Sequence, residues 1–144
     1  MAITTNAIAN SFKKELLEGK HDFTASTGSA FKLAMYNSAA TLGKSTTSYT
    51  TGSEVTSPAG YTAGGKALVN TGTSVATDVA ITTFSNLSFT NVTLTARGAL
   101  IYNTSNSNSA VAVLDFGSDK TATAGTFTIQ FPAYTTSAAI LRIS

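Results

Sequence analysis

From Phe31 onward, apolar and polar residues alternate one by one, and this two-residue period constrains the fold more than any other feature. Phe31, Leu33 and Met35 alternate with more polar or smaller neighbours, and Phe127 and Ile129 alternate with threonines. Successive side chains of a β-strand point to opposite faces, so these runs predict strands with one buried row. Shorter runs that also predict strands lie at 79–82, 87–94 and 140–143.

Two further runs, 99–102 and 110–116, are more continuously apolar. Such runs are typical of central strands that are covered on both faces. The polar stretch Ser105–Ser109 between them predicts a hairpin with an exposed tip. We expect 117–125 to be a longer connection, and Gly64-Gly65 to be a bulge or tight bend in a strand near 61–69.

One stretch near the N-terminus has a helical period. Ile8, Phe12 and Leu16 recur at four-residue steps, with Ala9 and Leu17 widening the apolar stripe. We predict a helix from about 6 to 18 that is capped by Asn6 or Thr5 and ends at Gly19. His21 would then lie near the negative end of the helix dipole. So short a helix is not stable alone, so its stripe must dock on the rest of the chain.

Together these patterns predict a mainly β fold: an antiparallel β-sandwich or flattened barrel of about seven or eight strands with one N-terminal α-helix. We expect a single domain over 1–144, with an N-terminal arm and helix at 1–23 and a β domain at 24–144. The segment 37–62 is the widest gap between strands, and loops of that length are usually functional or mobile. The expected core comprises Phe31, Leu33, Leu100, Val113, Phe127, Ile129 and Phe131.

Composition removes several classes of function. Charged residues make up 11 % of the chain, against about 25 % in an average soluble domain. Cysteine is absent and His21 is the single histidine, which excludes disulfide scaffolds and Cys-ligated metal sites. The formal net charge of +2 gives no argument for nucleic-acid binding, and no apolar run approaches a membrane span. The first residues have no secretory pattern, so we expect no export signal.

Three motifs that could carry chemistry are incomplete. The stretch 60–66 resembles most of a phosphate-binding loop, but Ala67 stands where that motif needs a serine or threonine. No Gly-x-Ser-x-Gly motif accompanies His21, which argues against a hydrolase. The carboxylates Asp78, Asp115 and Asp119 could bind calcium only if loops gathered them. We therefore expect no catalytic residue, no metal and no cofactor.

The scarcity of charge instead favours protein contacts. Threonine and serine surfaces can be covered with little desolvation penalty beyond their hydroxyl groups. Arg97 and Arg142 have two interpretations: charges at solvent-facing ends and edges, or salt bridges across a subunit contact. We expect the helix stripe to close the β domain while residues 1–5 and the Lys13 side touch neighbours. The candidate assembly contacts are Ile3, Ile8, Phe12, Lys13, Lys14, Leu16, Arg97 and Arg142, and the candidate surface-loop contacts are Tyr36, Tyr49 and Tyr61.

Six blocks, in this order, resemble a family of small virion proteins of marine tailed bacteriophages. They cover nearly the whole chain and lie at 11–23, 31–42, 61–66, 96–103, 110–117 and 125–132.

The resemblance implies a non-enzymatic structural protein that is assembled in the bacterial cytoplasm and carried in the virion. Its implied partners are other virion proteins and further copies of itself, with no nucleic acid and no membrane. A capsid decoration or cement protein is the leading expectation. A tail component is one alternative, and a host-glycan adhesin that uses the 37–62 loop is another.

Overall fold

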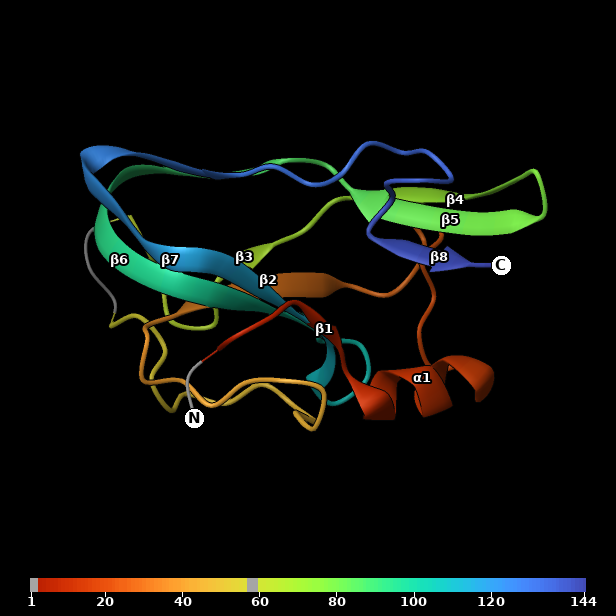
Figure 1. Ribbon diagram of the computed structural model, residues 1–144, viewed down its shortest axis with the longest axis horizontal. Coiled ribbons are helices and arrows are strands. Elements are labelled where there is room, and N and C mark those ends of the chain that lie inside the picture. Colours follow the sequence, from red (N-terminus) through yellow and green to blue (C-terminus); the bar gives the residue numbers. More distant parts are fainter. Residues whose placement is uncertain (1–2, 57–59) are drawn as a thin grey trace.

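The computed structural model describes residues 3–56 and 60–144. Within them the chain is mainly β, with one helix near the N-terminus and antiparallel strands, which confirms the predicted fold class. One sheet has the strand order β1-β7-β6-β2-β3 and the other has the order β4-β5-β8 (Figure 1). The elements are β1 (Ala7–Ile8), α1 (Asn10–Leu17), β2 (Phe31–Tyr36), β3 (Lys66–Ala67), β4 (Asn70–Ala76), β5 (Val79–Phe84), β6 (Leu87–Asn103), β7 (Ser109–Ile129) and β8 (Leu141–Ile143).

A long hairpin of β6 and β7 organises the molecule. Its register shifts between Ala96↔Lys120 and Gly98↔Asp115, so residues 116–119 of β7 face Arg97 alone. An excess of residues on one strand bends a ladder and increases its twist. Figure 1 shows both ribbons curving over at one end, so the two halves of the hairpin lie in different layers.

This bend corrects the expectation that 117–125 is a connection. The segment belongs to β7, where Thr121 pairs with Thr95 and Gly125 pairs with Val92. Gly117 provides the positive φ of +82° that the bulge needs. The expected strand near 61–69 is also reduced, to the two residues of β3. A strand that the sequence did not suggest, β4, follows it.

The inner halves of β6 and β7 form the centre of the five-stranded sheet, with β2 beside β6. Figure 1 shows the outer halves and the sheet β4-β5-β8 on one side of this layer, and the 37–56 segment and α1 on the other. Residues 98–103 and 109–113 are accordingly buried without alternation. The prediction of central strands for 99–102 and 110–116 is confirmed over this part of the hairpin.

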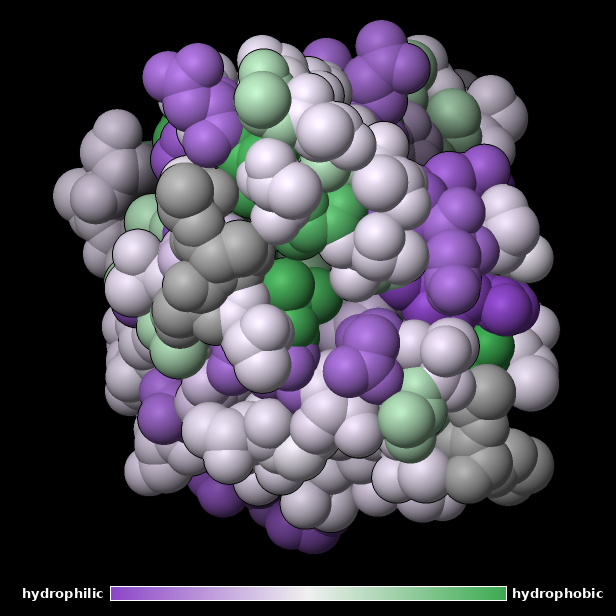
Figure 2. Space-filling model, turned by 90° about the vertical axis from the view of Figure 1, so that its left-hand side faces the viewer, coloured by the Kyte–Doolittle hydropathy of each residue, from purple (hydrophilic) through white to green (hydrophobic). Residues whose placement is uncertain are grey.

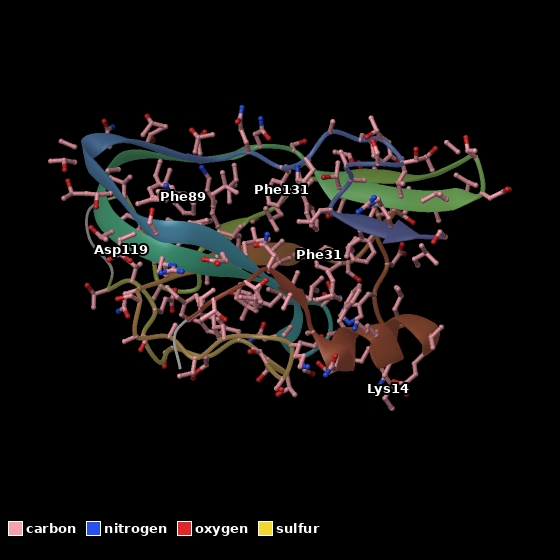
Figure 3. The ribbon with its side chains drawn as sticks, in the orientation of Figure 1. Lys14, Phe31, Phe89, Asp119 and Phe131 are labelled. Carbon is pink, nitrogen blue, oxygen red and sulfur yellow. The ribbon has the colours of Figure 1, made fainter. Side chains whose placement is uncertain are left out.

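Aromatic rings join the layers. Phe31 of β2 stacks on Phe23 with a centroid separation of 4.6 Å, and meets Phe84 of β5 at 5.6 Å. Phe131 lies 5.5 Å from Phe84, and Figure 3 shows Phe31 and Phe131 between the two layers. Six of the seven predicted core residues are buried. Phe131 is only half-buried, because it lies just beyond the last paired residue of β7.

The helix is shorter than the sequence suggested. It begins at Asn10, after an extended Ala9 with no capping side chain, because the preceding residues form β1 and pair with β7. The carbonyl-bearing side chain of Asn6 accepts a hydrogen bond from the backbone N–H of Asp115 at 2.6 Å instead of capping the helix. Gly19 has φ +72° just after the helix, as expected of a C-terminal stop. No helix among the described residues is long and apolar enough to cross a membrane.

Candidate functional site

The outer edge of β7 is open over most of its length. β6 pairs along one edge, and on the other edge β1 pairs at Ala112 and Val113. From Leu114 to Ile129 no strand within the described ranges pairs with that outer edge, although the Asn6 side chain accepts the Asp115 N–H at its start. Unpaired strand edges offer a row of backbone donors and acceptors to a strand of another chain.

Two shallow hollows follow this edge. One, of about 450 Å³, lies between β1 and the end of β7, and the other, of about 560 Å³, lies along residues 120–130. Phe116 and Ile129 line both hollows, so apolar contact is available beside the open backbone. Viewed from the bent end, Figure 2 shows mostly residues of intermediate hydropathy, with hydrophobic side chains at the floor of a central hollow.

A third hollow, a groove of about 780 Å³, lies between α1 and β8. Leu17 and Ile143 line it, and their exposed fractions are 91 % and 58 %. Lys13 and Arg142 lie in the same lining. The expectation that Leu17 widens the buried stripe is therefore wrong: Ala9 and Phe12 are buried, and Leu17 points to solvent.

The predicted assembly contacts fall into three environments. Ile3 and Phe12 are buried in the core, so the expectation that Ile3 touches a neighbouring subunit is wrong. The Ile3 side chain packs over Gly98, where a Cβ would lie 2.7 Å from Ile3 Cδ1. Ile8 and Leu16 are half-buried, and the exposed set is Lys13, Lys14 and Arg142.

Of the charged candidates, Lys14, Arg97 and Arg142 have partners within the chain, whereas the Lys13 side chain has none among the described residues. Lys14 donates to Glu18 one helical turn on, and Figure 3 shows Lys14 on the outer side of α1. Arg97 Nε donates to Asp115 Oδ1 at 3.1 Å across the hairpin, so this ion pair is internal. Arg142 lies in an edge strand, as one of its two interpretations required, and donates to the carbonyls of Thr136 and Ser137.

The tyrosines proposed as surface-loop contacts do not form a surface. Tyr36 and Tyr61 have exposed fractions of 0 % and 4 %, and Tyr49 is half-buried against Tyr102. The Tyr49 and Tyr61 hydroxyl groups donate to one buried carboxylate, and the Tyr36 hydroxyl group donates to the Thr50 carbonyl. This burial corrects the surface-loop assignment of Tyr36 and Tyr61, whereas Tyr49 stays partly exposed.

That carboxylate belongs to Glu54. Its Oε1 accepts from Tyr49 Oη at 2.5 Å, and its Oε2 accepts from Tyr61 Oη and the Gly64 N–H, both at 2.7 Å. Burial, together with the negative charge of Glu54, raises the pKa of the Tyr49 and Tyr61 hydroxyl groups far above the ordinary value. The tyrosines therefore stay protonated as donors, and the cluster fixes the loop against β2.

His21 is also buried rather than displayed at the end of the helix. The Ser105 N–H donates to Asn103 Oδ1, which turns the Asn103 amide nitrogen toward His21 Nδ1 at 3.0 Å. Nδ1 must then accept, so the proton of the neutral ring lies on Nε2 and faces Glu15 Oε1 at 3.4 Å. Burial lowers the pKa of His21, and the arrangement ties α1 to the β6–β7 turn.

The remaining motif residues are also held in place. Gly60, Gly64 and Gly65 have positive φ, and Lys66 Nζ donates to the Ser88 carbonyl at 2.6 Å. No group of three potential metal-binding side chains occurs in the described part of the chain. Asp78 lies at the β4–β5 turn, and Figure 3 places Asp119 at the bent end of the hairpin.

Comparison of the chain with protein-family models, with curated proteins and with solved structures found no match in any of the three.

Sequence reasoning did not identify Glu54 and Asn103 as buried polar residues, and it placed Leu17 in the buried stripe of the helix. Glu54 is the only acidic residue in 37–62, and tyrosines lie on both sides of it, which is a usable signal for a buried carboxylate. Asn103 ends a strongly apolar run, which is a usable signal for a buried polar residue. The helical period was a usable signal for Leu17, because at about 100° per residue Leu17 lies about 140° around the helix from Phe12, off the stripe of Ile8, Phe12 and Leu16.

Proposed function

We propose that the chain is a non-enzymatic structural protein of a tailed-phage virion, a capsid decoration or cement protein that bridges neighbouring capsid subunits. The observation that carries the proposal is the open outer edge of β7, from Phe116 to Ile129, with hollows beside it. An edge of this kind takes an extended segment of another protein by backbone hydrogen bonding, and the neighbouring hollows take its side chains.

A bridging protein must hold its contact surfaces rigidly. The β6–β7 hairpin places the open edge on strands whose inner halves are largely buried. β1 pairs with the inner half of β7, and Ile3 packs on Gly98, next to the bend. The exposed half of β7 carries mainly threonine, alanine and glycine between Lys120 and Ile129. Contact there desolvates hydroxyl groups rather than charges, which keeps the penalty low.

The sequence blocks that resemble marine phage virion proteins support the same proposal. The blocks 96–103 and 110–117 form the inner hairpin, and 125–132 contains the far end of the open edge. The resemblance thus covers both the scaffold and the proposed contact surface. The glycan-adhesin alternative loses its support, because Tyr36 and Tyr61 are buried.

The proposal is tested on particles of the phage that encodes the chain. Quantitative mass spectrometry of purified particles should find many copies of the chain per particle. A chain that is absent from purified particles would contradict the proposal.

A matched pair of variants tests the edge itself. Thr126→Lys places a charge on the open edge, where lysine opposes strand addition, whereas Thr51→Lys changes an exposed loop residue on the opposite side of the central sheet. We expect particles without the chain to rebind the Thr51 variant normally and the Thr126 variant at least about tenfold more weakly, a difference of about 1.4 kcal/mol. Equal rebinding would contradict a role for this edge.

A further inference from the structure

The groove between α1 and β8 contains both a protrusion and a recess. Leu17 stands out at the end of α1 with 91 % of its surface exposed, and Ile143 is 58 % exposed on β8. The recess between them is lined by apolar side chains, including Leu16, Ile140 and Leu141. Exposed side chains of this size beside an apolar recess mark a protein contact.

The groove also follows a free strand edge. Four consecutive residues, 141–144, line it. Alternate residues of a strand point to opposite faces, so a hollow lined by consecutive residues runs along the backbone edge. β5 pairs with the other edge of β8, and no strand among the described residues pairs with this one.

We propose that this groove is the contact between two copies of the chain, related by a twofold axis. β8 of one copy pairs antiparallel with β8 of the other, which joins the two three-stranded sheets into one of six strands. Leu17 of each copy enters the groove of the other. The proposal deepens the proposed function and rests on it in one respect, namely that the chain assembles with copies of itself.

The features of the groove favour a second copy over an unrelated partner. A twofold contact uses the same patch on both subunits, so that patch must contain complementary parts. This groove contains such parts side by side: a protruding Leu17, an apolar recess and the free edge of β8. That edge can pair antiparallel with the same edge of a second copy.

The charges around the groove do not select the partner. The groove lining has Lys13 and Arg142 and no acidic side chain among its described residues. Glu18, which follows Leu17, is paired with Lys14 and Lys20 of its own chain. The apolar side chains and the strand edge therefore carry the proposed contact.

The first experiment is sedimentation velocity of the purified chain over a concentration series. We expect a dimer at about 0.1 mM, where a micromolar Kd gives mostly dimer. Leu17→Glu should weaken dimerisation by about tenfold or more. Val75→Glu is the matched control, because Val75 is 73 % exposed on β4 and lies outside the groove lining. A strictly monomeric wild type, or equal effects of the two variants, would overturn the proposal.

A second experiment uses the absence of cysteine from the sequence. Single variants Leu141→Cys, Arg142→Cys and Ile143→Cys place one thiol at successive positions of β8. In an antiparallel twofold pair, the position nearest the axis meets its own copy at a distance that a disulfide spans. At least one variant should form a covalent dimer much faster than Val75→Cys under mild oxidation. No difference from Val75→Cys would overturn the pairing of β8.

These outcomes separate the two proposals. A chain that is monomeric in solution but abundant in particles would overturn the twofold contact and leave the proposed function standing. A chain that dimerises through Leu17 but is absent from particles would overturn the proposed function and leave the twofold contact standing.

Discussion

Tyr61 donates its hydroxyl proton to the buried Glu54 carboxylate at 2.7 Å, and the same oxygen accepts the Met35 backbone N–H at 2.9 Å. One hydroxyl group thus connects the 37–62 segment to the central strand β2. Tyr61→Phe leaves a buried N–H and a carboxylate oxygen each without this partner, so it should lower the free energy of unfolding by about 1–3 kcal/mol. Urea denaturation measures the change.

Tyr49→Phe is the comparison for that variant. Tyr49 donates to the other Glu54 oxygen but is only half-buried, so water can replace its hydroxyl group. We expect a smaller loss of stability than for Tyr61→Phe. An equal or larger loss would contradict the role assigned to Tyr61 between loop and strand.

Gly65 should be the most sensitive of the loop glycines to a methyl group. A Cβ there would lie 1.8 Å from the Leu33 carbonyl oxygen, and φ is +82°. Gly64 has a similar φ of +94°, but its Cβ would meet only the Tyr102 hydroxyl oxygen, at 3.5 Å. Both alanine variants carry the cost of positive φ, so the difference between their melting temperatures reports the steric clash. We expect Gly65→Ala to melt clearly below Gly64→Ala, and equal melting would refute the close approach.

Stability should fall as the pH drops below about 6.5, the ordinary pKa of histidine. The folded state lowers the pKa of His21, so the unfolded chain binds this proton more readily. The stability that the buried neutral His21 contributes is fully present above pH 6.5. It is lost as acidification protonates the histidine of the unfolded chain. Glu15 opposes the shift and burial dominates it.

Denaturant titrations at pH 7.5, 6.5 and 5.5 measure this effect, with His21→Gln as the control. The variant should show a flatter dependence over the same range, because no histidine remains. The same slope in both proteins would show that other groups cause the pH dependence.

The N-terminal arm should be required for folding, since Ile3, Ala9 and Phe12 are buried and β1 pairs with β7. Phe12→Ala should cost about 3–5 kcal/mol through lost burial and a cavity. Leu17→Ala, five residues further along but exposed, should change stability by less than about 0.5 kcal/mol. A chain that begins at His21 should therefore lack a cooperative unfolding transition, and a stably folded truncated chain would contradict this account.

The strand pattern was predictable because it follows from local sequence. The inner hairpin runs apolar as burial on both faces requires, and the structure places it accordingly. Phe31 to Tyr36 forms the predicted strand, but the expectation of a single buried row is wrong there, because Ala34 and Tyr36 are buried as well. The bend at Arg97 was not predictable. Residues 117–125 are polar, and the pairing of this part of the chain with residues 92–96 depends on contacts between segments far apart in the sequence. A polar, exposed strand and a loop have the same composition.

The candidate site was less predictable than the fold. Tyrosine has an apolar ring and a polar tip, so Tyr36 and Tyr61 suit both a binding surface and a buried hydrogen-bonded cluster. The choice depends on Glu54 and Gly64, which are brought together only by the folded loop. The exposure of Leu17 follows from its helical position, about 140° from the buried Phe12, which the four-residue spacing of the stripe already implies.

The central claim is that the chain binds the capsid exterior and bridges neighbouring subunits. An electron cryo-microscopy reconstruction of the purified phage head tests it most directly. We predict outer-surface density that fits the bent β6–β7 hairpin, with the open edge of β7 against a capsid subunit. A well-resolved head with no such density, or the chain located in the tail, would contradict the claim.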